Sequence, residues 1–320
     1  MQRRRFLKTL ALGAAVTLHP TAFAQTAANA LRVIVPTPAG GPSDAAARRL
    51  MQALGHDSGR QVVIDNRPGA GGAIAARAVL DARGDPHTLL WALGSMSGIP
   101  VLQKSPPYPS LEVFVPVSNV GRFVFALFVA ADVPAHSVAE LVALLRDKPD
   151  ALACAHGTLG EWMAAAQVFK ATGTRATMVP YKGGAQLMPD LASGRVQVNF
   201  GPLSSGLAQV QAGRVRALAV LAGQRSPLLP EVPTLAEAGI ATGPLPTWQA
   251  LLAAPASPPE MARTLSRQVA TALQDAELRG ALERLGLQVE GSTPEALTQT
   301  LSADAQVWRQ FVAEQQIAPE

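Results

Sequence analysis

Short apolar runs rich in valine, isoleucine and leucine recur along the chain, and most of them end in a turn that contains glycine or proline. Runs of about four to eight such residues, bounded by turn residues, are typical of buried strands. The pattern predicts strands at 31–36, 61–66, 88–93, 114–117, 123–129, 152–155, 177–180, 196–200, 216–221 and 248–254.

The segments between these strands carry apolar residues at helical spacing. The clearest helix start is Ser137-Val-Ala-Glu140, which has the sequence of a capping box. Strands that alternate with helices indicate right-handed βαβ units, and hence an α/β fold with mainly parallel sheets. Helices are expected at 45–54, 73–82, 137–146, 160–172, 185–192 and 203–211, with a long helix that opens at 258–260 and another at 294–315.

The order of these elements predicts two domains. A single hydrophobic core stops growing at roughly 250–300 residues, and this chain has 320. The middle block contains its own set of strands and helices, whereas the long helices of the tail have no matching strands and would pack on the first domain. We therefore expect one domain built from 31–122 together with 245–320, and a second domain at 123–244.

The formal net charge of +4 comes entirely from the N-terminal segment, where 3–8 holds four of the 27 basic residues. The 23 basic residues that remain equal the 23 acidic residues. No basic run interleaved with aromatic residues is left outside this segment, which argues against nucleic acid as a partner.

The N-terminal segment has the layout of an export signal. The basic stretch 3–8 precedes a weakly apolar run at 9–18 and a small-x-small cleavage site at 22–24. Apart from Gln2, the segment matches the twin-arginine pattern. We expect 1–24 to be a twin-arginine signal peptide and the mature protein to be periplasmic and not membrane-spanning. The alternative is a basic N-terminal arm on a cytosolic protein.

Little in the sequence points to catalysis or to metal binding. The single cysteine, Cys154, leaves no intramolecular disulfide and no cysteine-rich zinc site, and the five histidines lack metal-ligand spacing. Gly94-Ser-Met-Ser-Gly98 places Met96 where a nucleophile elbow needs its serine. Of the histidines, His156 is the one near a candidate pocket. We expect no cofactor, no metal and no enzymatic activity; an extracytoplasmic hydrolase assembled from distant residues is the alternative.

The turn at 37–44 links the first expected strand to the first expected helix, and Ser43 and Asp44 stand where an N-cap belongs. Such a turn presents unpaired backbone N–H groups at the C-terminal edge of a sheet, where anions commonly dock. Our hypothesis is that this loop holds a carboxylate. The same turn without a ligand is common in α/β proteins.

A second strand–turn–helix segment of this kind is found at 154–162 in the middle block. Its Gly157, Thr158 and Gly160 would expose backbone amides and one hydroxyl at the start of a helix. Two helix N-termini, one from each domain, could hold one small acid between them as the domains close.

Several motifs, read in order, strengthen this hypothesis. They are Val35-Pro-Thr-Pro-Ala-Gly-Gly-Pro-Ser-Asp44, Asp65-Asn-Arg-Pro-Gly-Ala-Gly-Gly72, and the segments 108–117, 179–183, 212–219, 229–239 and 254–258 with Trp248. Together they resemble the tripartite tricarboxylate transporter receptor family, the extracytoplasmic solute-binding proteins called Bug receptors. The resemblance covers about 31–318 and implies a two-domain periplasmic-binding-protein fold of type II. The two domains would close like a Venus flytrap about a hinge of two crossing strands, with the ligand between them.

The resemblance also implies that a ligand carboxylate lies between a first loop, 38–44, and a second loop, 157–163, partly through ordered waters. Ser95, at the edge of the third strand, and Asn199, near a strand end, could also face the cleft. The candidate ligand-binding residues are therefore Pro38, Ala39, Gly40, Gly41, Ser43, Asp44, Ser95, Gly157, Thr158, Leu159, Gly160, Glu161 and Asn199.

The second loop departs from the family pattern Gly-x-Gly-Ser-x-x-His. Leu159 replaces the second glycine, Gly160 the serine and Met163 the histidine, while Glu161 adds a negative charge. If the Glu161 side chain points inwards, a simple dicarboxylate is disfavoured, and an amino acid, an amide or a nicotinate-like aromatic acid gains.

These observations predict an exported, monomeric, non-catalytic receptor. It would bind a small organic acid, amino acid or related metabolite and deliver it to the membrane subunits of a tripartite tricarboxylate-type transporter. A ligand sensor for a membrane signalling partner is the alternative within the binding class.

Overall fold

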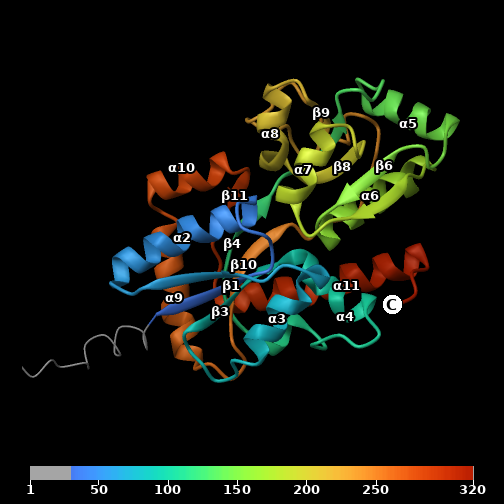
Figure 1. Cartoon of the computed structure of the whole chain (residues 1–320). Helices are drawn as coiled ribbons and strands as arrows, with labels where there is room; N and C mark the ends of the chain where they lie inside the picture. Colours follow the sequence, from blue (N-terminus) through green and yellow to red (C-terminus); the bar gives the residue numbers. More distant parts are fainter. Residues whose placement is uncertain (1–29, 320) are drawn as a thin grey trace, which may run out of the picture.

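The computed structural model describes residues 30–319, so the predicted signal peptide lies outside the described residues. The chain forms two lobes, each a sheet flanked by helices (Figure 1). This confirms the expected two-domain α/β architecture.

The first lobe contains a six-stranded sheet of order β11-β4-β10-β3-β1-β2. Its strands come from both ends of the described chain, since β10 and β11 return to it after the second lobe is complete. The strands are β1 (Leu31–Val35), β2 (Val62–Asn66), β3 (Thr88–Leu93), β4 (Val115–Phe123), β10 (Trp248–Ala253) and β11 (Leu287–Val289).

Helices cover both faces of this sheet (Figure 1). They are α2 (Pro42–Ser58), η1 (Ala70–Gly72), α3 (Ala73–Leu80), η2 (Gly94–Gly98), α4 (Ile99–Leu102), η3 (Leu111–Val113), α9 (Pro259–Ala272), α10 (Ala276–Arg284) and α11 (Pro294–Gln315). The tail differs from the expectation of one long helix, because the chain breaks before Asp275, which caps α10 by accepting the Leu278 N–H at 2.8 Å. The expectation that the long helices of the tail have no matching strand was also wrong, since β11 follows α10 and pairs with β4.

The second lobe contains a five-stranded sheet of order β7-β6-β8-β5-β9. Its strands are β5 (Phe125–Ala130), β6 (Ala153–His156), β7 (Thr177–Pro180), β8 (Val198–Pro202) and β9 (Val215–Leu221). Its helices are α5 (Val138–Asp147), α6 (Leu159–Thr172), α7 (Gly184–Ala192) and α8 (Leu203–Gln211). The predicted capping box is present at α5, where Ser137 Oγ accepts the Glu140 N–H and Glu140 accepts the His136 N–H.

The sheets are mixed rather than mainly parallel. Parallel pairing joins β1 to β2 and β3 in one lobe, and β6 to β7 and β8 in the other. The remaining pairs are antiparallel and involve β4, β5 and β10. β4, β5 and β10 adjoin the two crossings between the lobes. Each of them therefore runs in the direction opposite to that of the neighbouring strands that belong to βα units.

The two crossings run side by side and form a hinge. Phe123, at the end of β4, donates its backbone N–H to Thr247 O at 3.1 Å, so the outward and return segments are hydrogen-bonded to each other. The next residue, Val124, donates to Gly286 O at 3.2 Å and accepts from the Leu203 N–H at 2.8 Å. The backbone of Val124 is therefore hydrogen-bonded to both lobes.

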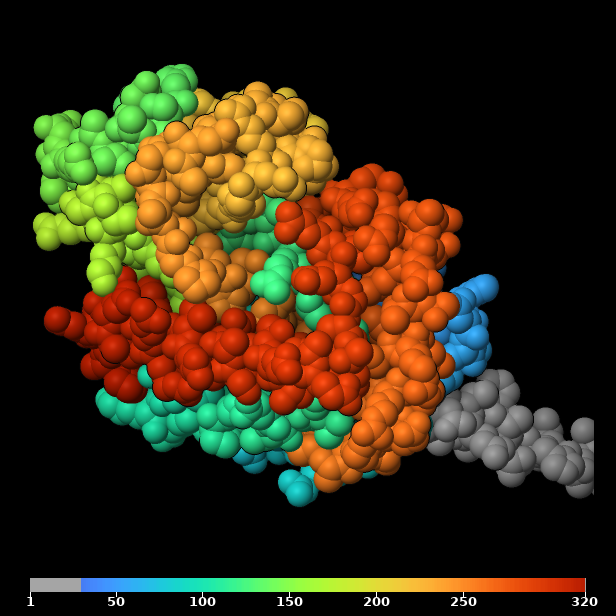
Figure 2. All heavy atoms as spheres, turned by 180° about the vertical axis from the view of Figure 1, so that it is seen from behind, coloured from blue at the N-terminus to red at the C-terminus, as the bar shows by residue number. Residues whose placement is uncertain are grey.

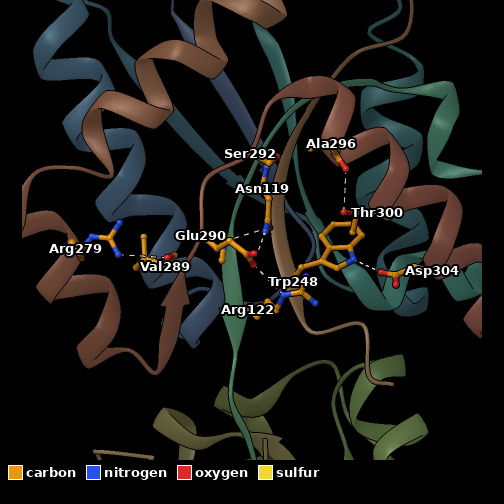
Figure 3. Close-up of polar contacts among 11 residues, drawn as sticks. Asn119, Arg122, Trp248, Arg279, Val289, Glu290, Ser292, Ala296, Thr300 and Asp304 are labelled. Carbon is orange, nitrogen blue, oxygen red and sulfur yellow. Dashed lines mark hydrogen bonds and ion pairs between the residues drawn. The ribbon is translucent and has the colours of Figure 1, made fainter. Parts of the chain in front are cut away.

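Side chains from β4, β10, α11 and the segment that follows β11 support the first-lobe side of this hinge (Figure 3). Glu290 accepts from Arg122 Nε at 3.1 Å and from Asn119 Nδ2 at 3.4 Å. The indole of Trp248, at the start of β10, donates to the carboxylate of Asp304 on α11. Helix α11 is thereby attached to the strand that follows the return crossing.

The lobes also meet along α6 and α11. Met163 on α6 packs in a small buried cluster with Trp308 and Phe311 on α11. The ring of Trp162 contacts that of Phe311 edge to face at a centroid distance of 5.4 Å. Viewed from behind, α11 in red crosses this face with its C-terminal end against the second lobe (Figure 2).

Candidate functional site

The first loop ends where α2 begins, and α2 begins earlier than the sequence suggested. Gly41 is the N-cap residue and Pro42 is the first helical residue, so Ser43 and Asp44 lie inside the first turn rather than at the N-cap. Proline is common at the first helical position because its fixed φ suits a helix. Its missing N–H costs nothing there, since an N–H at this position has no intrahelical acceptor.

Asp44, the third helical residue of α2, binds its own loop. Its carboxylate accepts the Gly40 N–H at 2.9 Å, Asn66 Nδ2 at 2.8 Å and Arg48 Nε at 2.9 Å. Burial alone would raise the pKa of Asp44, but the hydrogen bonds from Arg48, Gly40 and Asn66 outweigh burial and hold the pKa below its ordinary value. Asp44 is therefore ionised and has a protein cation as its partner.

Glu161, the third helical residue of α6, is placed in the same way in the second lobe. Thr158 is the N-cap residue and accepts the Glu161 N–H at 3.2 Å. In return, Glu161 Oε2 accepts the Gly157 N–H at 2.6 Å and lies 3.4 Å from Asn199 Nδ2. The side chain points inwards and is 3 % exposed.

The charge of Glu161 is poorly compensated. Burial raises the pKa of this carboxyl to about 7, although the hydrogen bonds from Gly157 and Asn199 act in the opposite direction. The burial of Cys154 itself, together with the charge of Glu161, raises the pKa of the Cys154 thiol. Because Cys154 is fully buried, it is a small core residue, as the sequence indicated.

A small cavity lies between the two loops and the hinge, with a volume of about 30 Å³. This is room for about one or two water molecules. It is lined by Ser43, Leu93, Gly94, Ser95, Phe123, Phe125, Thr158, Gly160, Glu161, Pro202, Pro246, Thr247 and Gln249.

The cavity is small because the lobes are in contact around it. A Cβ on Gly160 would lie 3.4 Å from Ser95 Cβ, across the boundary between the lobes. Gly183 in the second lobe meets the ring of Pro38 so closely that a Cβ there would lie 2.7 Å from Cδ. The structure therefore represents a conformation with the two loops together.

The structure brings five of the sequence-predicted residues to this cavity: Ser43, Ser95, Thr158, Gly160 and Glu161. The other candidate residues do not line it. Ala39 and Gly40 are exposed, Asn199 lies behind Glu161, and Leu159 faces a second cavity.

The sequence reasoning missed the lining residues contributed by the hinge and by β10. Gln249 is the clearest, because it is a polar residue within an otherwise apolar strand. Its Oε1 accepts the Trp91 indole N–H at 2.9 Å. The signal in the sequence that could have revealed this residue is a single side-chain amide within an apolar strand.

The second cavity, of about 670 Å³, opens on the other side of Leu159. Its lining includes Lys104, His156 and Trp162. Burial lowers the pKa of His156, although a backbone hydrogen bond at Thr158 acts against this. His156 thus lies beside a cavity, as the sequence suggested, and is neutral near pH 7.

Within residues 30–319, no three or more His, Cys, Asp or Glu side chains gather in a way that could hold a metal ion. No helix in that part of the chain combines the length and apolarity needed to cross a bilayer.

Two lobes joined by a double crossing, with helix N-termini meeting between them, define a periplasmic-binding-protein fold. A family model described as the tripartite tricarboxylate transporter family receptor matches residues 46–317. The chain belongs to this family of solute receptors.

Relatives and solved structures agree with this assignment. The chain is 33% identical to protein BugT of Bordetella pertussis, over 90% of this chain and 89% of BugT. It is similar to an R. palustris protein solved with adipate, at 30% identity and a TM-score of 0.85, covering 91% and 98% of the two chains. It is also similar to MatC from Rhodopseudomonas palustris with bound malate, at 26% identity and a TM-score of 0.81, covering 88% and 98%.

Proposed function

We propose that this protein captures a small carboxylate-bearing metabolite in the cleft between its lobes and delivers it to a tripartite tricarboxylate-type membrane transporter. One observation carries the proposal: the first turns of α2 and α6, one from each lobe, meet at a single cavity beside the hinge. Helix N-termini favour anions because their first N–H groups lack intrahelical partners.

In this proposal the ligand carboxylate binds at the N-terminus of α2. Ser43 and Ser95 offer hydroxyl donors there, and Thr158 offers one from the opposite lobe. Relatives with the same fold are solved with adipate and with malate, both of them carboxylates. Closure would bury the ligand and join the surfaces of the two lobes that a membrane partner contacts.

The remaining features of the proposal concern the cell and the chain as a whole. Residues 1–24 would direct export by the twin-arginine route to the periplasm, where the receptor acts as a monomer without catalysis. The chain would divide at the hinge into 31–122 with 245–320, and 123–244, as the sequence predicts. The thirteen candidate residues of the two loops, the third strand and β8 would form the ligand site and its immediate support.

A thermal-shift screen with a cleft-blocking variant tests this function. The panel contains dicarboxylates, tricarboxylates, amino acids, amides and aromatic acids. A ligand at a hundred times its dissociation constant stabilises the folded state by about 2.7 kcal/mol, which raises the midpoint measurably. G160L places a side chain in the cavity and should abolish the shift, while the free variant stays folded.

The matched control is G223L, because a side chain on Gly223 meets open space. This variant should respond to ligand as the unmodified protein does. Equal ligand responses in G160L and the unmodified protein would place the site elsewhere.

A further inference from the structure

We propose that the ligand of this cleft carries an amine as well as a carboxylate, and that Glu161 is the residue that selects for the amine. This inference rests on the proposed function, since it names the chemical class that the same cleft would take. The candidates are small zwitterionic acids, of which amino acids are the simplest.

Asp44 and Glu161 occupy equivalent positions in the two lobes. Both are the third helical residue after a strand, and both accept the backbone N–H of the glycine four residues earlier. Both also meet an asparagine from a neighbouring strand, Asn66 in one lobe and Asn199 in the other. The two lobes therefore hold a carboxylate in the same local frame.

Asp44 and Glu161 differ in whether a cationic side chain is their partner. Asp44 pairs with Arg48 at 2.9 Å, whereas the hydrogen bonds of Glu161 come from neutral donors. No ion pair of Glu161 occurs within residues 30–319. The second lobe thus buries a carboxylate whose charge a ligand could balance, because an ionised carboxylate is costly to bury without a counter-charge.

The cavity lining carries no positively charged side chain. Glu161 is its one ionisable side chain, and the lining includes no lysine, arginine or histidine. A simple dicarboxylate would add two negative charges beside a buried carboxylate, with helix N-termini and hydroxyls as the available compensation. A zwitterion instead places its carboxylate at α2 and its ammonium at Glu161.

Glu161 has hydrogen-bonding capacity that its protein partners leave free. Both of its hydrogen bonds go to Oε2, and Oε1 has no hydrogen-bond partner in the described chain. An ionised carboxylate accepts on both oxygens. Since Glu161 lines the cavity, Oε1 is available to a donor on the ligand.

The raised pKa of Glu161, about 7, agrees with this geometry. A buried acid with a strongly perturbed pKa is typical of functional sites. A ligand ammonium beside Glu161 would lower this pKa again, because opposite charges favour the ionised form.

The test compares amino acids with the acids that lack only the amine. Titration calorimetry of the purified protein at pH 7.5 would use aspartate with succinate, glutamate with glutarate, and alanine with propionate. A hydrogen bond between an ammonium and a carboxylate is stronger than one between neutral groups, so we expect the amino acid of at least one pair to bind at least about tenfold more tightly. E161Q should remove this preference, since the amide still accepts the Gly157 N–H but carries no charge.

E140Q is the matched control. Glu140 lies at the start of α5 in the same capping arrangement, is not among the residues that line the cavity, and accepts the His136 N–H at 2.7 Å. The E140Q variant should keep the preference of the unmodified protein.

A measurement on the unmodified protein covers the case in which E161Q does not fold. Affinity for the amino acid should rise from pH 6 to pH 8 as Glu161 ionises. The neighbouring groups do not reverse this trend, because burial raises the pKa of the Cys154 thiol and lowers the pKa of His156. The thiol stays neutral, and loss of a positive charge from His156 as the pH rises would act in the same direction. Affinity that falls over this range would mean that protonated Glu161 donates to a ligand carboxylate, and it would overturn the inference.

Two further outcomes separate the inference from the proposed function. If acids without an amine bind as tightly as their amino acids, with and without E161Q, the inference is wrong and the receptor function stands. If no member of any pair binds and the wider panel is also silent, both are wrong.

Discussion

At the scale of single residues, Glu161 makes the chemistry of this cleft particular to this chain. Its presence could be read from the sequence, but its orientation could not, because an acid in the first helical turn can equally face solvent. The hydrogen bonds from Gly157 and Asn199 turn it inwards. Asn199 lies in strand β8, far from Glu161 in the sequence, and no local sequence pattern predicts this contact.

The first prediction concerns the cost of this buried charge. A pKa near 7 in the folded state, against an ordinary 4.5, means that the folded state binds more protons than the unfolded state between these values. The free energy of unfolding should therefore fall as the pH rises from 4.5 through 7, by roughly 3 kcal/mol from this group. E161Q should lose this dependence.

Denaturant unfolding at pH 5 and pH 8 checks this expectation without any ligand. E161Q should be more stable than the unmodified protein at pH 8 and gain little or nothing at pH 5. E140Q should follow the unmodified protein at both pH values. A stability gain for E161Q that is equal at pH 5 and pH 8 would show that Glu161 carries no such cost.

At the scale of elements, the sequence predicted the strands and helices well where long apolar runs meet clear caps. Helix α5 is an example, since its capping box is present as predicted. Strand β11 was missed because three residues are too short to show alternation. The break between α9 and α10 was missed although Asp275 offers an N-cap there. The start of α2 was misplaced because Pro42 is the first helical residue, so that Ser43 and Asp44 lie inside the first turn.

The contact between α11 and β10 yields the second prediction. Trp248 is 1 % exposed, and its indole N–H donates to Asp304 (Figure 3). Burial raises the pKa of Asp304, while the bond from Trp248 acts against this rise. D304A leaves a buried donor without its acceptor, which should cost about 1–3 kcal/mol of unfolding free energy.

D304N is the control for this bond, because its amide oxygen can still accept the indole N–H. Urea unfolding should place D304N between D304A and the unmodified protein. Equal stability of D304A and the unmodified protein would mean that the bond contributes nothing to holding α11 on the sheet.

At the scale of the whole molecule, the two lobes and their order could be predicted because the motifs shared with the receptor family follow one another along the chain. The pairing within each sheet could not be predicted, because the crossings reverse the direction of the strands next to them. The contact between α6 and α11 was also missed. It joins Met163 to Trp308 and Phe311, residues whose helices belong to different lobes.

This contact yields the last prediction, which concerns the balance between open and closed conformations. Phe311 is 4 % exposed and packs against Trp308 within its own lobe and against Trp162 in the other. F311A removes apolar contact that exists between the lobes in the closed arrangement. The lobes should therefore separate more readily without ligand, and small-angle scattering should report a larger radius of gyration.

F114A distinguishes this effect from a general loss of stability. Phe114 is also buried and packs edge to face on Tyr108 within the first lobe, at a centroid distance of 5.8 Å. Both variants should lose about 3–5 kcal/mol of unfolding free energy, as buried phenylalanines do when truncated to alanine. Scattering should change for F311A alone, because a residue that packs within one lobe does not bias the hinge. If the two variants scatter identically while folded, the α6–α11 contact does not hold the lobes together, and closure rests on the two loops and the hinge.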